Sequence, residues 1–530
     1  MDASSNRKGP GTRWFHRHSL SGNGVTRRGF LGGLGGAVAL GSTSLGGVSL
    51  AGAAQAPATS NVPAAGALLP AGVPLRVKPV LTYQIPQRMA RTSWRPYGGL
   101  RTRQEVDAEA GKIAEELKGL ASRAEFPVEI LPLAVVGSDA EAAAAVGSDC
   151  DMFLVYASGG PQGWLEALAA SKKPNVMFVR HRSGPVYLWY EIAHYRFLRK
   201  SIDTFGEPNM DVDDVVVDDY GDVLWRLRAL YGLKNARGTR AIAIGGLQSY
   251  SSPGQEHGPA HAKDVWGYDI RIVPDTEVRE RIEKARADEN VLRAVEREAA
   301  ELLAQPGVTL DTDPKFIGNT LIAVRVFREI LGAAQAQNLG VANCMGSLIG
   351  LLDTPPCLAL SILNDSGFTA FCHTDFTHTP PGVLLRWISG KPSFVSNSHF
   401  PHHGIITMAH CAAPRKMDGK DFEPTRIMTH FESDYGAATK VQYRKGQVIT
   451  NIIPNLTCTK WFGFRGKVID SPSYDMCRSQ IDMEIDGDWK KLLSDMQGFH
   501  AITCYGDYLR EIGYALKKVG VAWQNFSETA

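Results

Sequence analysis

Half of the histidines in this chain fall in one segment, where acids and cysteines accompany them. Seven of the 14 histidines lie between His373 and His430 of the 530 residues. The densest stretch is CHTDFTH (372–378), followed by SHFPHHG, AHC and THFESDYG. Imidazole, thiolate and carboxylate groups are ligands of transition metals. The same residue types also cap loops and face water, so the spacing alone leaves a metal site and a solvated loop equally open.

Asp375 is the candidate ligand that we rank first, because a carboxylate suits Mg²⁺ or Mn²⁺ while imidazoles suit transition metals. His410 ends the apolar run IITMAHC, which predicts a buried strand. It is therefore either a hydrogen-bonded core residue or a ligand at a pocket rim. His500 precedes a similar apolar run. His402 and His403 lie between a proline and a glycine, and we expect this turn to face solvent.

The elements that must position these residues change along the chain. From residue 73, short apolar runs rich in β-branched residues alternate with helical patterns, which predicts two doubly wound α/β domains at 73–205 and 206–345. From residue 346 to 530 the strands alternate apolar and polar positions, as in RSQIDMEIDGD at 478–488. We predict a β-rich C-terminal domain that carries the site.

The N-terminal residues have the features of an export signal. The pair Arg27-Arg28 precedes a Gly/Ala-rich, weakly apolar stretch that ends in small residues near Ala53. This pattern predicts a twin-arginine signal peptide at 1–54, then a linker at 55–72 and a periplasmic or extracellular protein. Signal removal leaves 51 of the 57 basic and 54 of the 55 acidic residues, and this charge balance does not predict a nucleic-acid partner. The Gly-rich stretch after Arg28 is too weakly apolar for a stable membrane span.

Five segments, taken in order, resemble the C-terminal half of the L-fucose isomerase and L-arabinose isomerase-like family. The resemblance covers roughly residues 340–510 and extends more loosely to the preceding α/β region. The segments are NCMGSLIGLLDTPPCLALSILNDSGFTAFCHTD, SGKPSFVSN, ITMAHCAAP, THFESDYGAA and GFHAITCYGD.

This resemblance implies two α/β domains with a β-rich C-terminal domain, assembled as a homo-oligomer. It implies interconversion of an aldose and a ketose, in which Mn²⁺ holds adjacent sugar oxygens and stabilises the enediolate while a carboxylate moves a proton. Asp375 matches a family acid and His500 the late metal histidine, and His410 matches a site histidine of the arabinose enzymes. His373 stands where the family commonly has Glu, which makes the site more zinc-like or iron-like.

The catalytic candidates are three acids. Asp375 comes first, Asp353 is the nearest equivalent of a second family acid upstream, and Glu432 lies in THFESDYG. Two other functions remain open, namely an exported sugar-binding protein without turnover and a metal-dependent glycoside hydrolase or lyase. In each of these alternatives the ligand is a small sugar or glycoside.

Overall fold

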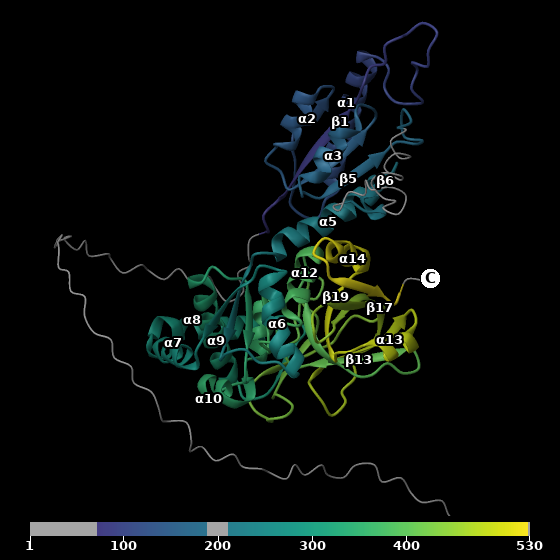
Figure 1. The fold of residues 1–530 in the computed structure, drawn as a ribbon. Helices are drawn as coiled ribbons and strands as arrows, with labels where there is room; N and C mark the ends of the chain where they lie inside the picture. The colour runs from purple at the N-terminus through teal and green to yellow at the C-terminus, as the bar shows by residue number, and fades with distance from the viewer. Residues whose placement is uncertain (1–70, 188–209, 528–530) are drawn as a thin grey trace, which may run out of the picture. The chain divides into compact units, whose positions relative to one another are not determined.

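The computed structural model describes residues 71–187 and 210–527. The chain in this part is mixed α/β, with two parallel sheets followed by a β-rich region that contains a barrel (Figure 1). The predicted signal peptide and residues 55–70 of the predicted linker lie outside the described residues.

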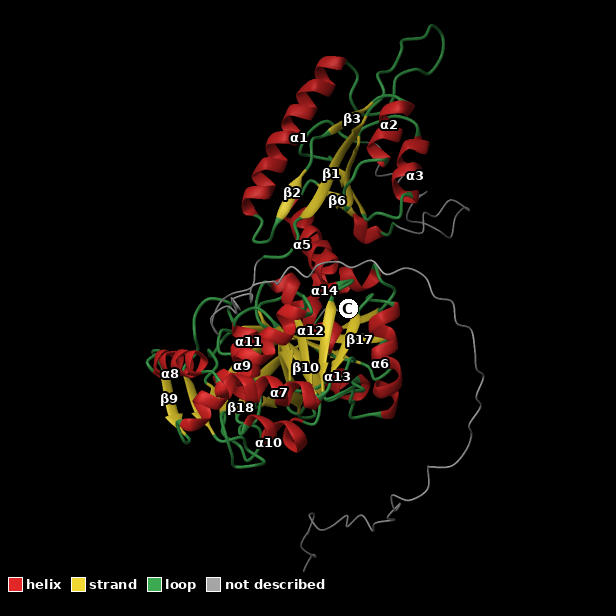
Figure 2. Cartoon of the chain, turned by 90° about the vertical axis from the view of Figure 1, so that its left-hand side faces the viewer, coloured by secondary structure: helices red, strands yellow, loops and turns green. Residues whose placement is uncertain are grey.

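The first α/β region contains a sheet of six parallel strands in the order β2-β1-β4-β5-β6, with β3 also pairing β1. Figure 2 shows α1 on one side of this sheet and α2 and α3 on the other. Helices on both faces explain why β4 reads as a continuous apolar run with every residue buried. The sheet ends at residue 217 with β6, later than the predicted boundary at 205. The elements are β1 Leu75–Thr82, α1 Arg103–Arg123, β2 Val128–Ile130, β3 Ala134–Val136, α2 Asp139–Val146, β4 Met152–Ala157, α3 Gln162–Ala170, β5 Asn175–Val179, η2 Val212–Asp214, β6 Val215–Val217 and α5 Tyr220–Ala236.

The second α/β region has four parallel strands in the order β11-β10-β7-β8. Helix α9 presents the predicted apolar stripe, with Ile317, Leu321, Val324 and Phe327 all buried. The sheet takes in β11, so this region continues past the predicted boundary at 345. The elements are β7 Arg240–Ile244, α6 Ser252–Asp264, β8 Asp269–Val273, α7 Asp275–Ala287, α8 Glu289–Leu303, α9 Lys315–Ala333, β10 Asn338–Val341, the π-helical turn η3 Cys344–Leu348, α10 Ile349–Leu352, α11 Cys357–Asp365, β11 Thr369–Phe371 and α12 Thr379–Ser389.

Six antiparallel strands of the C-terminal region close into a barrel in the order β16-β19-β12-β13-β18-β17, and β17 pairs back onto β16. The alternating strand predicted from RSQIDMEIDGD is β18, and Ile481, Met483 and Ile485 are its buried hydrophobic residues. The elements are β12 Phe394–Ser398, β13 Ile405–His410, β16 Val448–Pro454, β17 Lys460–Asp470, β18 Ser479–Asp486, α13 Trp489–Asp495, β19 His500–Tyr505, α14 Leu509–Lys517 and β20 Ala522–Asn525, which runs parallel to β17. A separate three-stranded sheet joins β9 Val308–Asp311, β14 Thr425–Met428 and β15 Ala438–Val441.

No single helix within residues 71–187 and 210–527 is long and apolar enough to cross a membrane. Two successive segments, Cys344–Leu352 and Cys357–Asp365, meet the length and composition criteria only as a pair, and they are bent by 86° at the break between them.

Candidate metal centre and the adjoining pocket

The CHTDFTH stretch lies where the topology of the second sheet favours ligand binding. In the strand order β11-β10-β7-β8, β8 lies on one side of β7 and β10 on the other. The direction in which strands are added to the sheet therefore reverses at β7. Crevices at the carboxyl ends of strands beside such a reversal are the usual ligand sites of parallel sheets. Cys372 follows the last residue of β11, and His378 immediately precedes α12. The sequence thus places its densest group of chemically active residues at this edge.

The loop after β7 packs against this stretch through hydrogen bonds. The backbone N–H of Gln248 donates to Thr374 Oγ1 at 2.9 Å, and Ser249 Oγ donates to Asp375 Oδ2 at 2.5 Å. The Gln248 side chain accepts from the N–H of Asn343, the residue before the π-helical turn, at 3.0 Å. The loops after β7, β10 and β11 are therefore held together as one unit.

The barrel contributes two more histidines from neighbouring strands. His410 is the last residue of β13 and His500 is the first of β19. Strand β12 lies between them, and its Asn397 pairs with both Ala409 and His500. Residues 90 positions apart in the sequence are thereby brought to the same end of the barrel. The buried strand predicted to end at His410 is confirmed.

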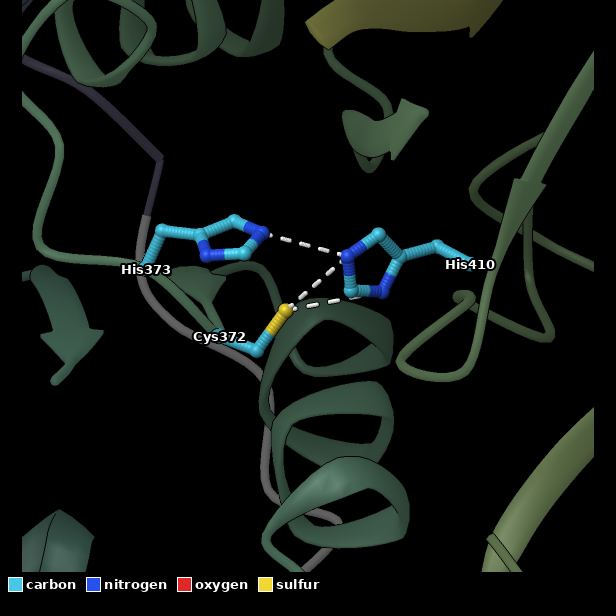
Figure 3. A group of neighbouring side chains, drawn as sticks. All are labelled: Cys372, His373 and His410. Carbon is cyan, nitrogen blue, oxygen red and sulfur yellow. Dashed lines mark hydrogen bonds between the residues drawn. The ribbon is translucent and has the colours of Figure 1, made fainter. Parts of the chain in front are cut away.

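Cys372, His373 and His410 form a buried cluster that can bind a metal ion, with one ligand atom of each residue within 4.8 Å of the other two (Figure 3). His373 Nε2 lies 3.2 Å from His410 Nε2, which lies 3.3 Å from Cys372 Sγ. Bonds of about 2.0–2.1 Å to nitrogen and about 2.3 Å to sulfur place tetrahedral N···N and N···S pairs about 3.3 and 3.6 Å apart. The two edges at His410 are close to these values, and the third edge, between Cys372 and His373, is within 4.8 Å, so the three donors suit a tetrahedral ion.

Burial sets the protonation of the donor atoms. It lowers the pKa of His410 to about 4 and holds the pKa of His373 well below its usual value, with neighbouring histidines adding to the second shift. Both imidazoles are neutral at pH 7 and have lone pairs to offer. Burial also raises the pKa of the Cys372 thiol, and Cys344 and Cys411 contribute. A metal must therefore displace a proton from Cys372 when it binds.

Without a metal, the same atoms satisfy one another through hydrogen bonds. The backbone N–H of Cys411 donates to His410 Nδ1 at 3.0 Å, which leaves the proton of the neutral ring on Nε2. That proton can be donated to His373 Nε2. A metal ion that binds His410 Nε2 must displace this proton and break the hydrogen bond to His373 Nε2. The N–H of Cys411 fixes which ring nitrogen carries the proton, so its position influences the affinity for the metal.

Asp375, the first-ranked ligand, does not belong to this cluster of donor atoms. One of its oxygens accepts the backbone N–H of Thr377 at 2.9 Å, and the other accepts the hydroxyl of Ser249. Such a carboxylate organises its own turn, as Asp commonly does before a helix. Cys372, which was not among the predicted ligands, joins His373 and His410 in the cluster, and the role of Asp375 as a metal ligand stays a prediction.

Asp375 instead lines a small pocket beside the metal cluster, together with Tyr250, His378, Phe499 and His500. The pocket has a volume of about 80 Å³. The Nε2 atoms of His378 and His500 are buried and have no hydrogen-bond partner. Buried polar atoms without partners are rare in folded proteins and commonly mark ligand sites. Burial lowers the pKa of both rings, so these nitrogens are neutral donors or acceptors at pH 7.

The four histidines form a continuous group around this pocket. The ring centroid of His373 lies 4.7 Å from that of His500 and 5.3 Å from that of His410. The centroids of His378 and His500 are also 4.7 Å apart. His500, a predicted metal ligand, therefore touches the cluster but lies on its pocket side. The ring of Tyr250 packs 5.0 Å from both His373 and His500.

The other two predicted catalytic acids, Asp353 and Glu432, do not line this pocket. Asp353 accepts the Tyr435 hydroxyl at 2.5 Å and the Asn319 amide at 3.1 Å, and it ends α10 with a φ of 54°. It is therefore occupied in a structural role. Glu432 is exposed in the turn after β14, near enough to contribute to the raised pKa of Cys344 and Cys477. The pair His402 and His403 is exposed, as predicted.

Sequence reasoning missed Cys372 and His378 as site residues. Cysteines are usually small buried hydrophobes. A solvated loop was one of the two readings left open for the stretch that contains His378, yet only 1% of this residue is exposed. The available signal was their position at the carboxyl end of a buried strand, immediately before a helix. Tyr250 follows the GG pair after β7, where the sequence already suggested a ligand-facing loop.

The comparisons with known proteins add no family. No protein-family model matches the chain, and no curated protein matches its sequence.

Proposed function

We propose that the chain is a metal-dependent enzyme of the aldose–ketose isomerase type, acting on a small sugar. The observation that carries the proposal is the pocket formed by Asp375, His378 and His500 directly beside the Cys372–His373–His410 cluster. A carboxylate, unpartnered imidazole nitrogens and metal ligands are the groups that proton transfer between neighbouring sugar carbons requires. The resemblance of the C-terminal segments to the L-fucose and L-arabinose isomerase-like family supports the same reaction.

The donor set favours zinc, or iron, over manganese. One thiolate and two imidazoles are softer ligands than the oxygen atoms that Mn²⁺ prefers. Three protein ligands with a fourth position open is the arrangement of catalytic zinc sites. When bound, the ion supplies Lewis acidity to substrate oxygens. We therefore propose Zn²⁺ in place of the Mn²⁺ that the family resemblance implies.

The protein groups have separate roles in this proposal. Asp375 is the base, because it is buried in the pocket wall and Ser249 and the Thr377 N–H fix its orientation. The Nε2 atoms of His378 and His500 bind substrate hydroxyls, which would satisfy their missing hydrogen bonds. The rings of Tyr250 and Phe499 cover the pocket and limit the access of water.

Solvent-proton exchange tests the reaction directly. Purified protein loaded with Zn²⁺, Fe²⁺ or Mn²⁺ is incubated with pentoses and hexoses in D₂O, and NMR detects deuterium next to the carbonyl carbon. We expect exchange and interconversion, reduced about 100-fold or more in Asp375→Asn with metal content unchanged. Asp353→Asn is the matched control and keeps its turnover. Sugar binding without exchange in any metal form would refute the isomerase and leave a binding protein.

A metal-dependent glycoside hydrolase or lyase is the second candidate. It stays open because the second acid that the family resemblance implies is missing from the pocket, whose lining contains a single carboxylate, Asp375, within the described residues. Release of reducing sugar from aryl glycosides, without deuterium incorporation into free sugars, would support this alternative.

We also propose export by the twin-arginine route and assembly as a homo-oligomer. A fusion of residues 1–60 to a reporter protein tests export, with Arg27→Lys/Arg28→Lys as its control. A reporter that stays in the cytoplasm with both arginines intact would refute the localisation. Light scattering of the mature protein tests the oligomer.

A further inference from the structure

The segment between β1 and α1 is a long loop, residues 83–102, which we call the arginine loop. Its 20 residues contain no helix or strand. Loops longer than about 12–15 residues without secondary structure are uncommon in compact domains and are usually functional. The sequence YQIPQRMARTSWRPYGGLRT has four arginines and no lysine, aspartate or glutamate. The whole chain has 57 basic and 55 acidic residues, so this positive charge is a local feature.

Hydrogen bonds attach the arginine loop to its domain at the two ends. The backbone N–H of Tyr83 donates to the carbonyl of Val136 at 3.0 Å, and that of Gly99 donates to the carbonyl of Val186 at 2.7 Å. Residues 84–98 make no hydrogen bond with the rest of the described chain. Figures 1 and 2 show the loop projecting from the end of the first sheet. Packing against its own domain therefore does not account for the composition of the loop.

The arginines of the loop have no acidic partner. All four are exposed, and within residues 71–187 and 210–527 none of them forms an ion pair. They are Arg88, Arg91, Arg95 and Arg101. The next arginine along the chain, Arg103, does form an ion pair, with Asp107 at 2.9 Å. The charge of the loop is thus available to a partner outside the chain.

Apolar side chains accompany the arginines at the surface. Tyr97 is 82% exposed, the largest fraction of any large hydrophobic residue in the described part of the chain, and Met89 and Ile85 are 60% and 39% exposed. Trp94 is half-buried, and the Arg95 guanidinium lies 5.3 Å from the centre of its ring. Arginine, aromatic and aliphatic side chains together are typical of segments that lie in a membrane interface.

We propose that the arginine loop docks the folded protein on an anionic lipid surface. The four arginines contact lipid phosphates, while Tyr97, Met89 and Ile85 enter the boundary between headgroups and acyl chains. Single-stranded nucleic acids also attract arginine and aromatic side chains, but their sites follow the backbone along a charged groove. Here the charges lie on one projecting loop and aliphatic side chains accompany them, which favours lipid.

Flotation of the full chain with lipid vesicles tests the proposal. Vesicles of phosphatidylcholine alone are compared with an equal mixture of phosphatidylcholine and phosphatidylglycerol, at low and high salt. We expect stronger binding to the mixed vesicles, weakened by salt because the charges are exposed. Arg88→Gln/Arg91→Gln/Arg95→Gln should lower the affinity for mixed vesicles by about two orders of magnitude, at about fivefold per arginine.

A matched control removes the same charge elsewhere. Arg279→Gln/Arg293→Gln/Arg297→Gln changes three exposed arginines of α7 and α8 and should bind vesicles as the wild type does. The N-terminal arginines are present in every sample, so any difference between variants reports on the substituted residues. An equal loss in the control, or full binding by the variant of the arginine loop, would overturn the proposal. So would equal binding of the wild type to both kinds of vesicle.

A third variant separates insertion into lipid from attraction to charge alone. Met89→Ser/Tyr97→Ser keeps every arginine and should weaken binding to mixed vesicles about tenfold, because less apolar surface leaves water. Both side chains are exposed, so circular dichroism should show an unchanged fold. Binding that this variant retains in full, and from which an oligonucleotide displaces the vesicles, would show that the loop recognises an acidic polymer and not lipid.

Discussion

The replacement Cys372→Ser tests the metal centre most directly. Serine keeps the size and the hydrogen-bonding capacity of the side chain, but its hydroxyl does not deprotonate as a thiol does. Structural zinc sites with four ligands contribute about 10–16 kcal/mol, or about 2.5–4 kcal/mol per ligand. Loss of Cys372 should therefore weaken zinc binding by about two to three orders of magnitude. His373 and His410 remain as ligands, so weak binding persists.

The assay is competition with a chromophoric zinc chelator, followed by elemental analysis of the dialysed protein. Cobalt substitution adds a spectroscopic test, since a thiolate ligand gives an intense near-ultraviolet band that Cys372→Ser should lack. Cys504→Ser is the control, because that thiol is equally buried but outside the cluster. Unchanged zinc affinity in Cys372→Ser, or no thiolate band in the cobalt-substituted wild type, would refute the ligand assignment.

Three further outcomes are expected. Burial raises the pKa of the Cys372 thiol, so zinc must displace its proton when it binds. The zinc affinity measured by chelator competition should therefore rise about tenfold per pH unit near neutrality, and an affinity that does not change with pH would contradict this. Gly340→Ala should weaken zinc binding and lower stability by about 1–3 kcal/mol, because its Cβ would lie 2.4 Å from the His373 carbonyl oxygen; the control Gly332→Ala meets nothing within 4 Å and should bind zinc normally. Burial alone would raise the pKa of Asp218, but hydrogen bonds from Ser183 and neighbouring N–H groups lower it, so Asp218→Asn should cost about 1 kcal/mol in urea unfolding above pH 4, with the difference disappearing in acid.

The local elements of the fold were largely predictable from the sequence. The apolar stripe of α9 and the alternation in β18 follow directly from side-chain periodicity. The charged helical pattern at 275–304 is continuous in the sequence but forms two helices, α7 and α8, because Asp288 caps α8 by accepting the N–H groups of Asn290 and Val291. Periodicity continues across such a break, so only the capping residue signals it.

The pairing of distant strands was less predictable. Strands β6 and β11 are short, three residues each, and each is added to its sheet by pairing with the preceding strand, β5 or β10. Local patterns do not specify which sheet such a strand completes. The two sheets therefore extend beyond residues 205 and 345, where the sequence placed its domain boundaries.

The candidate site was only partly predictable, because local sequence patterns do not specify which distant segments come into contact. His373 and His410 were among the expected ligands. His373 belongs to the histidine-rich stretch CHTDFTH, and His410 ends an apolar strand pattern. Their contact with Cys372 depends on packing of the barrel against the loop after β11, which no spacing in the sequence reveals. Asp375 ranked first because a carboxylate is a common ligand, but two nearby donors already occupy its oxygens.

Closure of the barrel determines when the metal centre can form. Strand β13 is held between β12 and β18, and the ring is complete only when β19, residues 500–505, has paired with both β12 and β16. These pairings join residues 50 to 109 positions apart, and such pairings form late in folding. His410 therefore reaches Cys372 only after nearly the whole chain has been synthesised. An ion can therefore bind this cluster only in the fully folded chain. We expect a truncated chain that lacks β19 to bind no metal there.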